Sequence, residues 1–439
     1  METKPHVVII GGGFAGLACA QSLKRAPVEV TLVDRRNHHL FQPLLYQVAT
    51  AALNPGDIAY PIRAALRRQK NAKVLLAEVT EIDRENRRIK LGDSEITYDY
   101  LVVAAGAKHS YFGNKAWEQH APGLKTVEDA LEIRRRVLMA YENAEVLVDD
   151  VEARKAWLTF AVVGGGPTGV ELAGALAEIG RYTLAKDFRT IDPRSVRVVL
   201  FEAGGRLLPG FPDKCAANAE SQLKKLGVEV RKNCRVSDLD EGSLIADGDR
   251  LETRTVLWAA GVEASPLAKA LNCSLTKAGQ VVVDEYLRVP DTPCLWVVGD
   301  MAHMEDENGT VPALAPAASQ AGRYVGKNIR RHLRGKTPEP FRYVDKGALA
   351  TVGRSRAVGH FREKITFSGL FAWMVWWFVH IFFLVGFRSR IAVMFGWIWN
   401  YLTFQRGARL ITGRWDPENK SLERVLPGSE SSKDLGGVG

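Results

Sequence analysis

Two glycine-rich turns are the parts of this chain whose residue types and spacing point most directly to chemistry. Both fit the spacing G-x-G-x-x-G, and both directly follow an apolar run, HVVII in the first case and LTFAVV in the second. Their glycines are Gly11, Gly13 and Gly16 in the first turn and Gly164, Gly166 and Gly169 in the second. Between a buried strand and a helix, such a turn lets the backbone approach a pyrophosphate at the helix N-terminus. The repetition favours two dinucleotide sites over the alternative, which is two tight turns without a ligand.

An acidic residue follows each turn at the end of the next predicted strand. These residues are Asp34 and Glu202. A carboxylate at this position accepts a hydrogen bond from a ribose hydroxyl and repels a 2′-phosphate, so Glu202 favours NADH over NADPH. Each unit then closes with an apolar strand and a small-residue turn, at residues 100–106 and 256–261. The duplication predicts two Rossmann-like domains, the second inserted in the first.

Composition sets the broad class of the protein. A chain of 439 residues is long enough for two or three domains, and 46% hydrophobic with 25% charged residues is typical of a folded globular protein. The net charge is +9, and residues 341–439 hold 14 Lys and Arg against 7 Asp and Glu, together with six of the ten tryptophans. This positive charge flanks long apolar runs, which favours an anionic membrane surface and argues against nucleic acid.

The C-terminal part contains two apolar runs. Residues 366–387 include no Lys, Arg, Asp or Glu, so this run is long enough by length alone to span a bilayer. The second run, residues 391–404, is too short to cross the bilayer in the opposite direction. The many Trp residues and the interruption at His380 favour helices that lie on the membrane. A single span, or a soluble protein that buries both runs in a dimer interface, are the alternatives.

The five cysteines are scattered without C-x-x-C spacing, so we expect neither a metal site nor a disulfide framework. No secretory signal precedes the first strand, and we expect a cytoplasmic catalytic body.

The pattern of residues 127–148 predicts an amphipathic connecting helix with its arginines in solvent. Glu171, in the helix after the second turn, is surrounded by Ala, Gly and Leu, and such surroundings raise the pKa of a carboxyl group.

Together, these segments resemble the type II NADH dehydrogenases, which are single-subunit NADH:quinone oxidoreductases that do not pump protons. The resemblance covers residues 5 to about 415 and is carried by VVIIGGGFAGL, HLFQPLLYQVAT, GGGPTGVELAG, LWVVGDMA, the A-x-x-A-x-Q of residues 315–320 and the aromatic-basic end. It implies an α/β fold with two Rossmann-like domains and a C-terminal amphipathic helical membrane-anchoring segment. We expect an FAD-binding domain at 1–125 and 275–340, an NADH-binding domain at 126–274, a membrane-associating domain at 341–425 and a disordered tail at 426–439.

The resemblance also implies cofactors, partners and site residues. The cofactors are non-covalent FAD and NADH/NAD+, and the acceptor is a membrane quinone of the ubiquinone, menaquinone or plastoquinone type. We expect a homodimer, monotopic on the cytoplasmic face of the cell inner membrane. Glu171 and Gln320 are the expected catalytic residues. The expected cofactor contacts are Gly11, Gly13, Phe14, Ala15, Gly16, Asp34, Arg35, Pro43, Leu44, Gly106, Gly164, Gly166, Pro167, Thr168, Gly169, Glu202, Gly261, Gly299 and Asp300.

The chain departs from the family in two respects. The family pattern beside the flavin is A-Q-x-A-x-Q, and Pro316 stands at the position of the first Gln, which removes one amide from the quinone side. No calcium-binding loop interrupts the chain. In flavin reductases with a redox disulfide, the paired cysteines are expected at about the position of residues 37–68, yet no Cys occurs between Cys19 and Cys215. We therefore expect direct electron transfer between the nicotinamide, the flavin and the acceptor, without a dithiol relay. His38 and His39 are expected in a solvated loop, with Pro43 and Leu44 beside the flavin ring.

Two other functions stay open at this stage. One is an NAD(P)H-dependent flavin reductase that serves a soluble electron-transfer protein, and the other is a flavoprotein that senses NADH.

Overall fold

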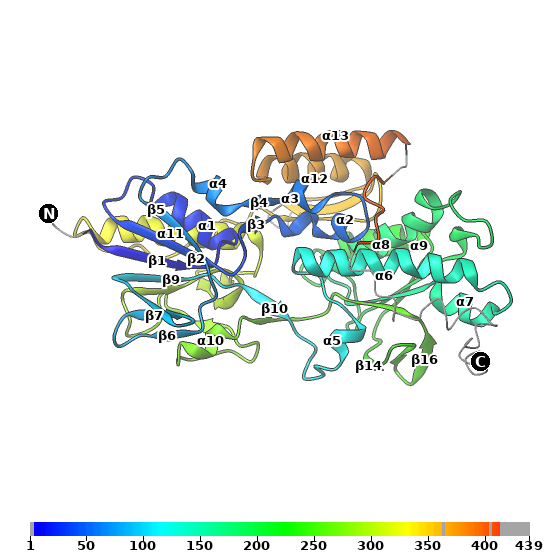
Figure 1. Ribbon diagram of the computed structural model, residues 1–439, viewed down its shortest axis with the longest axis horizontal. Helices are drawn as coiled ribbons and strands as arrows, with labels where there is room; N and C mark the ends of the chain where they lie inside the picture. The colour runs from blue at the N-terminus through cyan, green and yellow to red at the C-terminus, as the bar shows by residue number, and fades with distance from the viewer. Residues whose placement is uncertain (1–3, 362–364, 404–405, 413–439) are drawn as a thin grey trace, which may run out of the picture.

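A five-stranded parallel sheet forms the core of the N-terminal half of the protein (Figure 1). The computed structural model describes residues 4–361, 365–403 and 406–412. The strand order is β20-β9-β1-β2-β5, with β1 (His6–Ile10), β2 (Glu29–Asp34), β5 (Ala72–Leu76), β9 (Tyr100–Val103) and β20 (Leu295–Val297). The inner and β20-side strands β1, β9 and β20 are nearly continuous apolar runs because both faces of the sheet are covered there, whereas the edge strand β5 is partly exposed.

A second parallel sheet repeats this arrangement. Its order is β13-β12-β11-β17, with β11 (Thr159–Val163), β12 (Arg197–Phe201), β13 (Val228–Arg231) and β17 (Thr255–Trp258). In both sheets the strand before the glycine turn is central, flanked by the strand before the acid and by the closing strand. The chain returns to the first sheet only at β20, which pairs with β9. The predicted fold, with the second domain inserted in the first, is confirmed.

Helices cover the two sheets. They are α1 (Phe14–Ser22), α6 (Val127–Val146), α7 (Val151–Trp157), α8 (Pro167–Glu178), α9 (Asp213–Lys225) and α11 (Ala315–His332). Two of them, α1 and α8, begin directly after the glycine turns. α6 begins with a capping box in which the Thr126 hydroxyl accepts from the Asp129 N–H. α11 packs directly on α1, because a Cβ at Gly322 would lie 2.0 Å from the carbonyl oxygen of Ala15. The small residues of α11 therefore serve mainly helix packing, although Ala318 also reaches the cavity described below.

Shorter elements complete the two domains. Antiparallel meanders are formed by β6 (Glu81–Asp83), β7 (Arg88–Leu91) and β8 (Ser94–Thr97), and by β14 (Val236–Leu239), β15 (Ser243–Ala246) and β16 (Asp249–Glu252). Strands β10 (Ala107–His109) and β18 (Val262–Ala264) pair where the chain crosses between the domains. The remaining short elements are β3 (His38–Leu40), η1 (Gln42–Leu44), α2 (Leu45–Ala49), α3 (Pro55–Ile58), β4 (Ala59–Pro61), α4 (Ile62–Leu66), α5 (Trp117–His120), η2 (Ile179–Thr183), η3 (Pro193–Ser195), α10 (Leu267–Ala270), β19 (Val281–Val282), η4 (Gly299–Met301), β21 (Ala302–His303), β22 (Glu305–Asp306) and β23 (Gly309–Thr310).

The C-terminal part adds a small antiparallel sheet and two helices. The sheet contains β24 (Ala348–Thr351), β25 (Ala357–Phe361) and β26 (Ile365–Ser368), and it was not foreseen from the sequence. The apolar run 366–387 is divided between β26, α12 (Gly369–Phe383) and the start of α13 (Phe387–Thr403). Within the ranges described, none of the helices has both the length and the apolar character needed to cross a membrane. The predicted tail at 426–439 lies outside the described residues.

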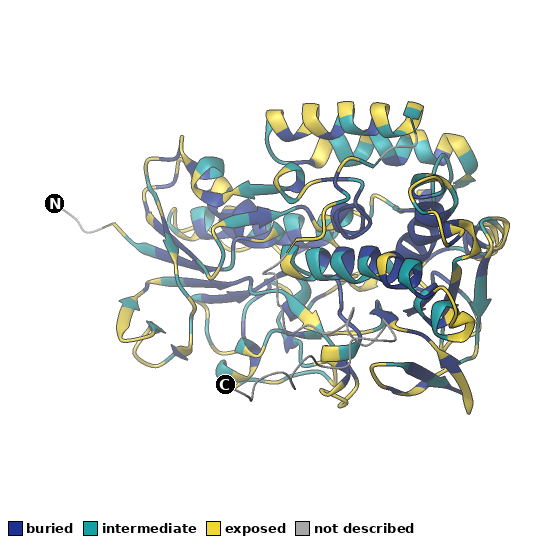
Figure 2. Cartoon of the chain, turned by 45° about the vertical axis from the view of Figure 1, so that its right-hand side comes forward, coloured by how far each residue is buried: buried dark blue, intermediate teal, exposed yellow. Residues whose placement is uncertain are grey.

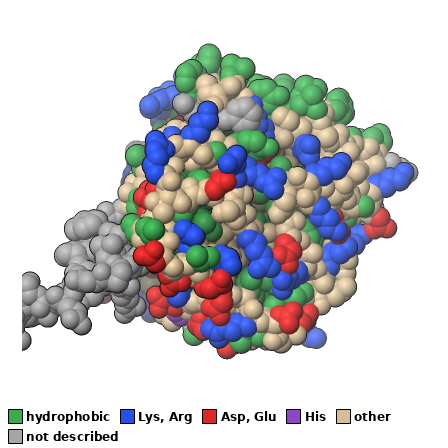
Figure 3. All heavy atoms as spheres, turned by 90° about the vertical axis from the view of Figure 1, so that its right-hand side faces the viewer, with side chains coloured by type: hydrophobic (Ala, Val, Ile, Leu, Met, Phe, Trp, Pro, Cys, Tyr) green, Lys and Arg blue, Asp and Glu red, His purple; other side chains and the backbone are tan. Residues whose placement is uncertain are grey.

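The two C-terminal helices pack on the body with one face and expose the other, which is also apolar. Ala372, Trp376, Val393 and Trp397 are buried. The exposed residues are Leu370, Phe371, Met374, Phe378, Phe382 and Phe383 on α12 and Phe387, Ile391, Phe395, Ile398, Trp399 and Leu402 on α13. Figure 2 shows these exposed positions along the outer side of the helix pair, and Figure 3 shows hydrophobic side chains gathered along the same upper edge of the molecule.

Arg134 on α6 is not in solvent, and the prediction for this residue is wrong. Its guanidinium is buried and donates to the carbonyl oxygens of Val48 at 2.9 Å, Leu53 at 3.0 Å and Ala408 at 3.1 Å. Val48 lies at the end of α2, whereas Leu53 and Ala408 lie outside helices and strands, so one guanidinium connects three separate parts of the backbone. Arg134 thereby ties the segment after α13 to the body of the protein.

Candidate functional site

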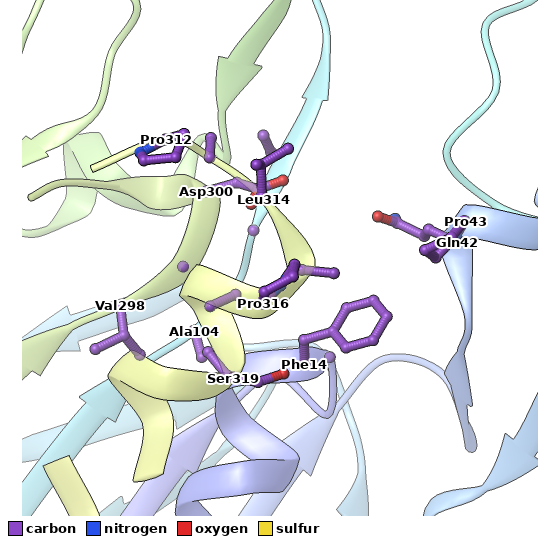
Figure 4. Close-up of a pocket in the computed structure, with 18 of the residues that line it drawn as sticks. Phe14, Gln42, Pro43, Ala104, Val298, Asp300, Pro312, Leu314, Pro316 and Ser319 are labelled. Atoms are coloured by element: carbon purple, nitrogen blue, oxygen red, sulfur yellow. The ribbon is translucent and has the colours of Figure 1, made fainter. Parts of the chain in front are cut away.

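A single cavity of about 2150 Å³ runs between the two domains and the C-terminal part. Its walls come from the starts of α1, α8 and α11, from η1 and η4, from β24 and β25, and from α12. Figure 4 shows Phe14, Pro316 and Ser319 on one side of it, with Gln42 and Pro43 across from them. Both glycine turns therefore open on the same space.

The first turn has the geometry that a phosphate group needs. Gly11 has a φ of +100°, and a Cβ there would lie 2.3 Å from the carbonyl oxygen of Ala104. At Gly16 a Cβ would meet the Gly11 oxygen at 1.8 Å, so only glycine lets α1 start this close to β1. Gly13, the N-cap of α1, has nothing within 4 Å of its Cβ position, which leaves room at the helix N-terminus.

The second turn repeats this geometry. Gly164 has a φ of +110°, a Cβ at Gly169 would lie 1.8 Å from the Gly164 oxygen, and the Cβ position of Gly166 is open. Gly166 caps α8 and lines the cavity. A dinucleotide pyrophosphate fits each turn for the same physical reason, since amides free of side chains face open space.

The acids after the turns have equivalent hydrogen bonds. Asp34 accepts from the N–H of Gly12 and of Arg36, each at 2.6 Å, and Glu202 accepts from Gly165 and Gly204, each at 2.6 Å. Each carboxylate holds its own glycine turn in place, and a ribose hydroxyl would be an additional donor. The Arg206 guanidinium bonds Asp213 and the carbonyl oxygens of Pro209 and Phe211, so it is already engaged within the protein.

Most of the predicted site residues line the cavity. They are Gly11, Gly13, Phe14, Ala15, Asp34, Arg35, Pro43, Gly106, Gly166, Pro167, Thr168, Glu171, Gly299 and Asp300. The others are not part of its lining: Gly16, Leu44, Gly164, Gly169, Glu202, Gly261 and Gln320. For the glycines this follows from their packing against neighbouring segments. Gly261, for example, faces the ring of Phe112.

Three expectations about individual side chains need correction. Leu44 is fully buried in the core, and its neighbours Gln42 and Pro43 form the wall in its place. Gln320 does not face the cavity, because its amide donates to the carbonyl oxygen of Val344 and accepts from the Val344 N–H, both at 3.0 Å. His39 is 2% exposed, and its Nδ1 lies 3.1 Å from the Gly12 oxygen, so it supports the first glycine turn and is not solvated.

Pro316 is compatible with the start of α11. It lies in the first turn of the helix, where a backbone N–H has no intrahelical partner in any case. Its ring lines the cavity together with Ser319, as Figure 4 shows. Arg323, one turn further along α11, also lines the cavity. The departure from the family pattern therefore replaces an amide by an apolar surface at this wall.

Glu171 combines burial with access to the cavity. Its side chain is nearly excluded from solvent and lines the cavity, and its Oε1 accepts from the Thr351 N–H at 3.3 Å. Burial raises the pKa of Glu171 to about 8, partly offset by its hydrogen bonds from Thr351. Near neutral pH the group is thus mostly protonated and titrates within reach of the solution pH.

A chain of hydrogen bonds connects α13 with Glu171. The indole Nε1 of Trp397 donates to Gln47 Oε1 at 2.6 Å, Gln47 Nε2 donates to Tyr46 Oη at 3.0 Å, and Tyr46 Oη lies 2.8 Å from Thr351 Oγ1. An indole can only donate, so the amide oxygen of Gln47 must face it and the amide nitrogen must face Tyr46. Between Tyr46 and Thr351 either hydroxyl can donate. The chain reaches the carboxyl group through Thr351, whose backbone N–H donates to Glu171.

Several residues of this region are missing from the sequence-based prediction. Tyr46 and Gln47 lie in the segment HLFQPLLYQVAT, where two polar side chains within an apolar run are the available signal. α8 carries a second buried carboxylate, Glu178, which pairs with Arg406 at 3.3 Å. Burial raises the pKa of Glu178, although its contacts with Arg406 oppose the shift.

His380 of α12 is a further cavity residue. Its Nδ1 lies 2.7 Å from the Trp376 carbonyl oxygen, and its ring stacks on the Trp376 ring at 4.2 Å. Burial lowers the pKa of His380 to about 4, so the ring is neutral at physiological pH. Because a carbonyl can only accept, Nδ1 carries the proton and Nε2 remains an acceptor.

Comparison with known families matches nearly the whole chain. The family model described as pyridine nucleotide-disulphide oxidoreductase covers residues 5–322, and the model described as NDH2 C-terminal domain covers residues 346–406. All five cysteines of the chain are free in the structure.

Two proteins of Mycobacterium tuberculosis are similar to the chain over almost its full length. The type II NADH:quinone oxidoreductase Ndh is 44% identical, with 96% of this chain and 93% of the relative covered, and NdhA is 45% identical, with 93% and 90% covered. Among solved structures, that of NDH2 from Plasmodium falciparum in complex with NADH has a TM-score of 0.86 at 22% identity and covers 93% of this chain and 100% of that one.

Proposed function

The chain belongs to the type II NADH:quinone oxidoreductases, and on this premise we propose that it oxidises NADH and reduces a membrane quinone without pumping protons. The observation that carries the proposal is one cavity that joins both glycine turns, Glu171 and the apolar helix α12. NADH, FAD and quinone can thus meet in one space.

We propose that FAD binds at the first glycine turn and NADH at the second, and the neighbours of the first turn support this order. The first turn belongs to the domain that also contributes Gly299, Asp300 and the start of α11, a long wall suited to the larger resident cofactor. FAD held at Gly11, Gly13 and Asp34 would supply the redox chemistry, which is acceptance of a hydride from NADH and delivery of two electrons to the quinone. The protein binds and orients the two nucleotides through the amides at Gly13 and Gly166.

Glu171 is proposed to hold and move protons at the carboxyl group. A group with a pKa of about 8 is protonated often enough to donate and ionised often enough to be refilled. Quinone reduction consumes two protons, and the donors that converge from Thr351 keep the carboxyl group oriented. Gln320 has a supporting role in this proposal, since its amide fixes residue 344 at the cavity wall.

The quinone is proposed to enter beside α12. Val375, Val379 and Phe383 of that helix line the cavity, while its other face exposes Phe371 and Phe378. An apolar helix with one face towards the cavity and one towards the outside suits a ligand that arrives from lipid. The acceptor belongs to the ubiquinone, menaquinone or plastoquinone class in this proposal.

We further propose that the protein is monotopic on the cytoplasmic face of the inner membrane and forms a homodimer. The exposed apolar residues of α12 and α13 and the excess of basic residues in the C-terminal part support attachment to an anionic lipid surface. We also propose the domain boundaries expected from the sequence.

The activity is tested by three parallel assays of NADH oxidation by the holoenzyme, with a short-chain quinone, with a ferredoxin and with oxygen alone. We expect rapid turnover only with the quinone. Faster turnover with ferredoxin would indicate a flavin reductase, and slow turnover with every acceptor would indicate an NADH sensor.

A further inference from the structure

A second, smaller cavity lies where the turn between α12 and α13 meets the N-terminal domain. It has a volume of about 450 Å³ and is lined on one side by Val385 and Gly386 of that turn. The turn is held closely, because a Cβ at Gly386 would lie 2.6 Å from the ring of Tyr60 on β4. The cavity therefore lies at a closely packed junction between the apolar helix pair and the body of the protein.

The opposite side of this cavity is basic. Lys24, which follows α1, and Arg67 and Arg68, which follow α4, line it together with Tyr60. All three cations are exposed, and within the part of the chain that the structure describes none has an ion pair within 4 Å. Elsewhere arginines of the same domain do pair, for example the exposed Arg35 with Glu78 and the half-buried Arg36 with Glu128. Three neighbouring positive charges without a carboxylate repel one another unless an anion joins them.

The position of this cavity indicates which anion. Figure 1 shows α4 beside the helix pair, and the exposed Phe382, Phe383 and Phe387 flank the turn that forms the cavity wall. If these apolar residues enter the lipid, the cations lie at the level of the head groups. A soluble anion would gain nothing from the apolar wall at Val385, whereas a phospholipid presents a phosphate and an acyl chain together.

We propose that this cavity binds the head group of an anionic phospholipid, with Lys24, Arg67 and Arg68 around the phosphate and the α12–α13 turn against the lipid chain. The proposal rests on the membrane attachment inferred above, but it concerns a separate site, distant in sequence from the basic C-terminal residues. Such a site would hold the helix pair at a fixed depth and orientation in the membrane.

The test compares binding of the full-length holoenzyme to vesicles of phosphatidylcholine alone and to vesicles that also contain 30% phosphatidylglycerol. The variant is R67Q/R68Q. The control is R235Q/K269Q, which removes the same charge beside β14 and in α10, on the side of the molecule opposite α12 and α13 (Figure 1). We expect wild type and control to bind more tightly when phosphatidylglycerol is present. The variant should bind vesicles with phosphatidylglycerol roughly 10- to 30-fold more weakly than wild type does, with unchanged binding to phosphatidylcholine alone.

Equal losses in variant and control would overturn the proposal, because they would indicate diffuse attraction. Reversal of the phosphatidylglycerol gain by 10 mM inorganic phosphate at constant ionic strength would also overturn it, since the site would then be one for soluble phosphate. Failure of all proteins to bind either vesicle would refute the membrane attachment itself. Turnover with a short-chain quinone in detergent, expected to be unchanged in the variant, shows separately that the enzyme is folded and active.

Discussion

The indole of Trp397 donates to the side-chain oxygen of Gln47 over 2.6 Å and so joins the C-terminal helix α13 to α2. Both side chains are buried. Because the indole cannot accept, this bond fixes the orientation of the Gln47 amide, which donates to Tyr46, and Tyr46 connects through Thr351 to Glu171. The hydrogen bonding of the carboxyl group therefore depends on how α13 docks.

Removing the indole N–H as Trp397→Phe should raise the pKa that governs quinone reduction by about 0.5 to 1 unit. Without that donor the Gln47 amide can turn and Tyr46 can release Thr351, so the ionised form of Glu171 loses stabilisation. The titratable groups around the carboxyl group are Tyr46 on α2 and, further along α8, the Glu178–Arg406 pair, and neither is altered. The measurement is the pH profile of kcat with a short-chain quinone.

The control for this experiment is Trp399→Phe on the same helix. Trp399 is 60% exposed, and its ring is outside the hydrogen-bond chain. A profile that moves equally in both variants would reflect a general change in α13, and a profile that stays fixed in Trp397→Phe would show that the chain has no effect on Glu171.

The fold was predictable because repeated local signals agree. Continuous apolar strands, glycine turns at 11 and 164, and acids at 34 and 202 each specify the same strand-turn-helix unit. The β24–β26 sheet was missed, since its strands are short and β26 begins the apolar run that also contains α12. A long apolar run does not reveal where a strand ends and a helix begins.

The site was predictable where backbone geometry defines it and less so where side chains from distant segments meet. The glycines and Asp34 follow from spacing alone. The environment of Glu171 depends on Thr351, 180 residues away, and on Tyr46. Leu44 and Gln320 point away from the cavity because η1 and α11 present other faces to it, and a motif does not specify the rotation of a helix.

Replacing Glu202 by Gln should weaken NADH binding and reduce discrimination against NADPH, by roughly 10-fold each. The amide retains one acceptor but loses the charge that repels a 2′-phosphate and holds Gly165 and Gly204. The measurement is kcat/KM for both nucleotides. Asp34→Asn, which alters the equivalent bond at the first turn, should leave this ratio unchanged, and a wild type that already uses both nucleotides equally would refute the assignment.

The stability of the protein should depend on pH through Glu171. Its pKa is about 8 in the folded protein against an ordinary 4.5, so between these values the folded chain retains a proton that the unfolded chain releases. The stabilisation by the neutral group is complete below pH 4.5 and is lost as pH rises through 8. The side chain of Glu171→Gln cannot ionise. The difference in Tm, variant minus wild type, should therefore be larger at pH 9 than at pH 5. A difference that stays constant with pH would contradict the shifted pKa.

Charges placed on the exposed apolar face should release the protein from membranes. Met374 and Phe378 are 51% and 66% exposed and one turn apart on α12, so M374E/F378E leaves the packed face intact. Vesicle sedimentation should show that the ratio of bound to free protein falls by at least about 10-fold, because charged side chains resist burial in lipid. Val148→Glu, at an exposed position beyond α6, is the control and should bind as wild type does. Retention of M374E/F378E on neutral vesicles would locate the attachment elsewhere.

Replacing Glu171 by Gln separates the two halves of the reaction. The variant keeps the size of the side chain and its bond from the Thr351 N–H but removes the titrating group. If the carboxyl group delivers protons to the quinone, kcat with quinone should fall by roughly 10- to 1000-fold, the usual range for a general acid–base group. The single-turnover reduction of the holoenzyme by NADH should change much less, since hydride transfer needs no proton from the protein. Tyr46→Phe, which retains the carboxyl group and removes only a donor behind it, should lie between the variant and the wild type. Stopped-flow measurement of each half-reaction decides the question: equal losses in both would assign Glu171 to nucleotide or cofactor binding, and an unchanged oxidative half-reaction would exclude it as the proton donor.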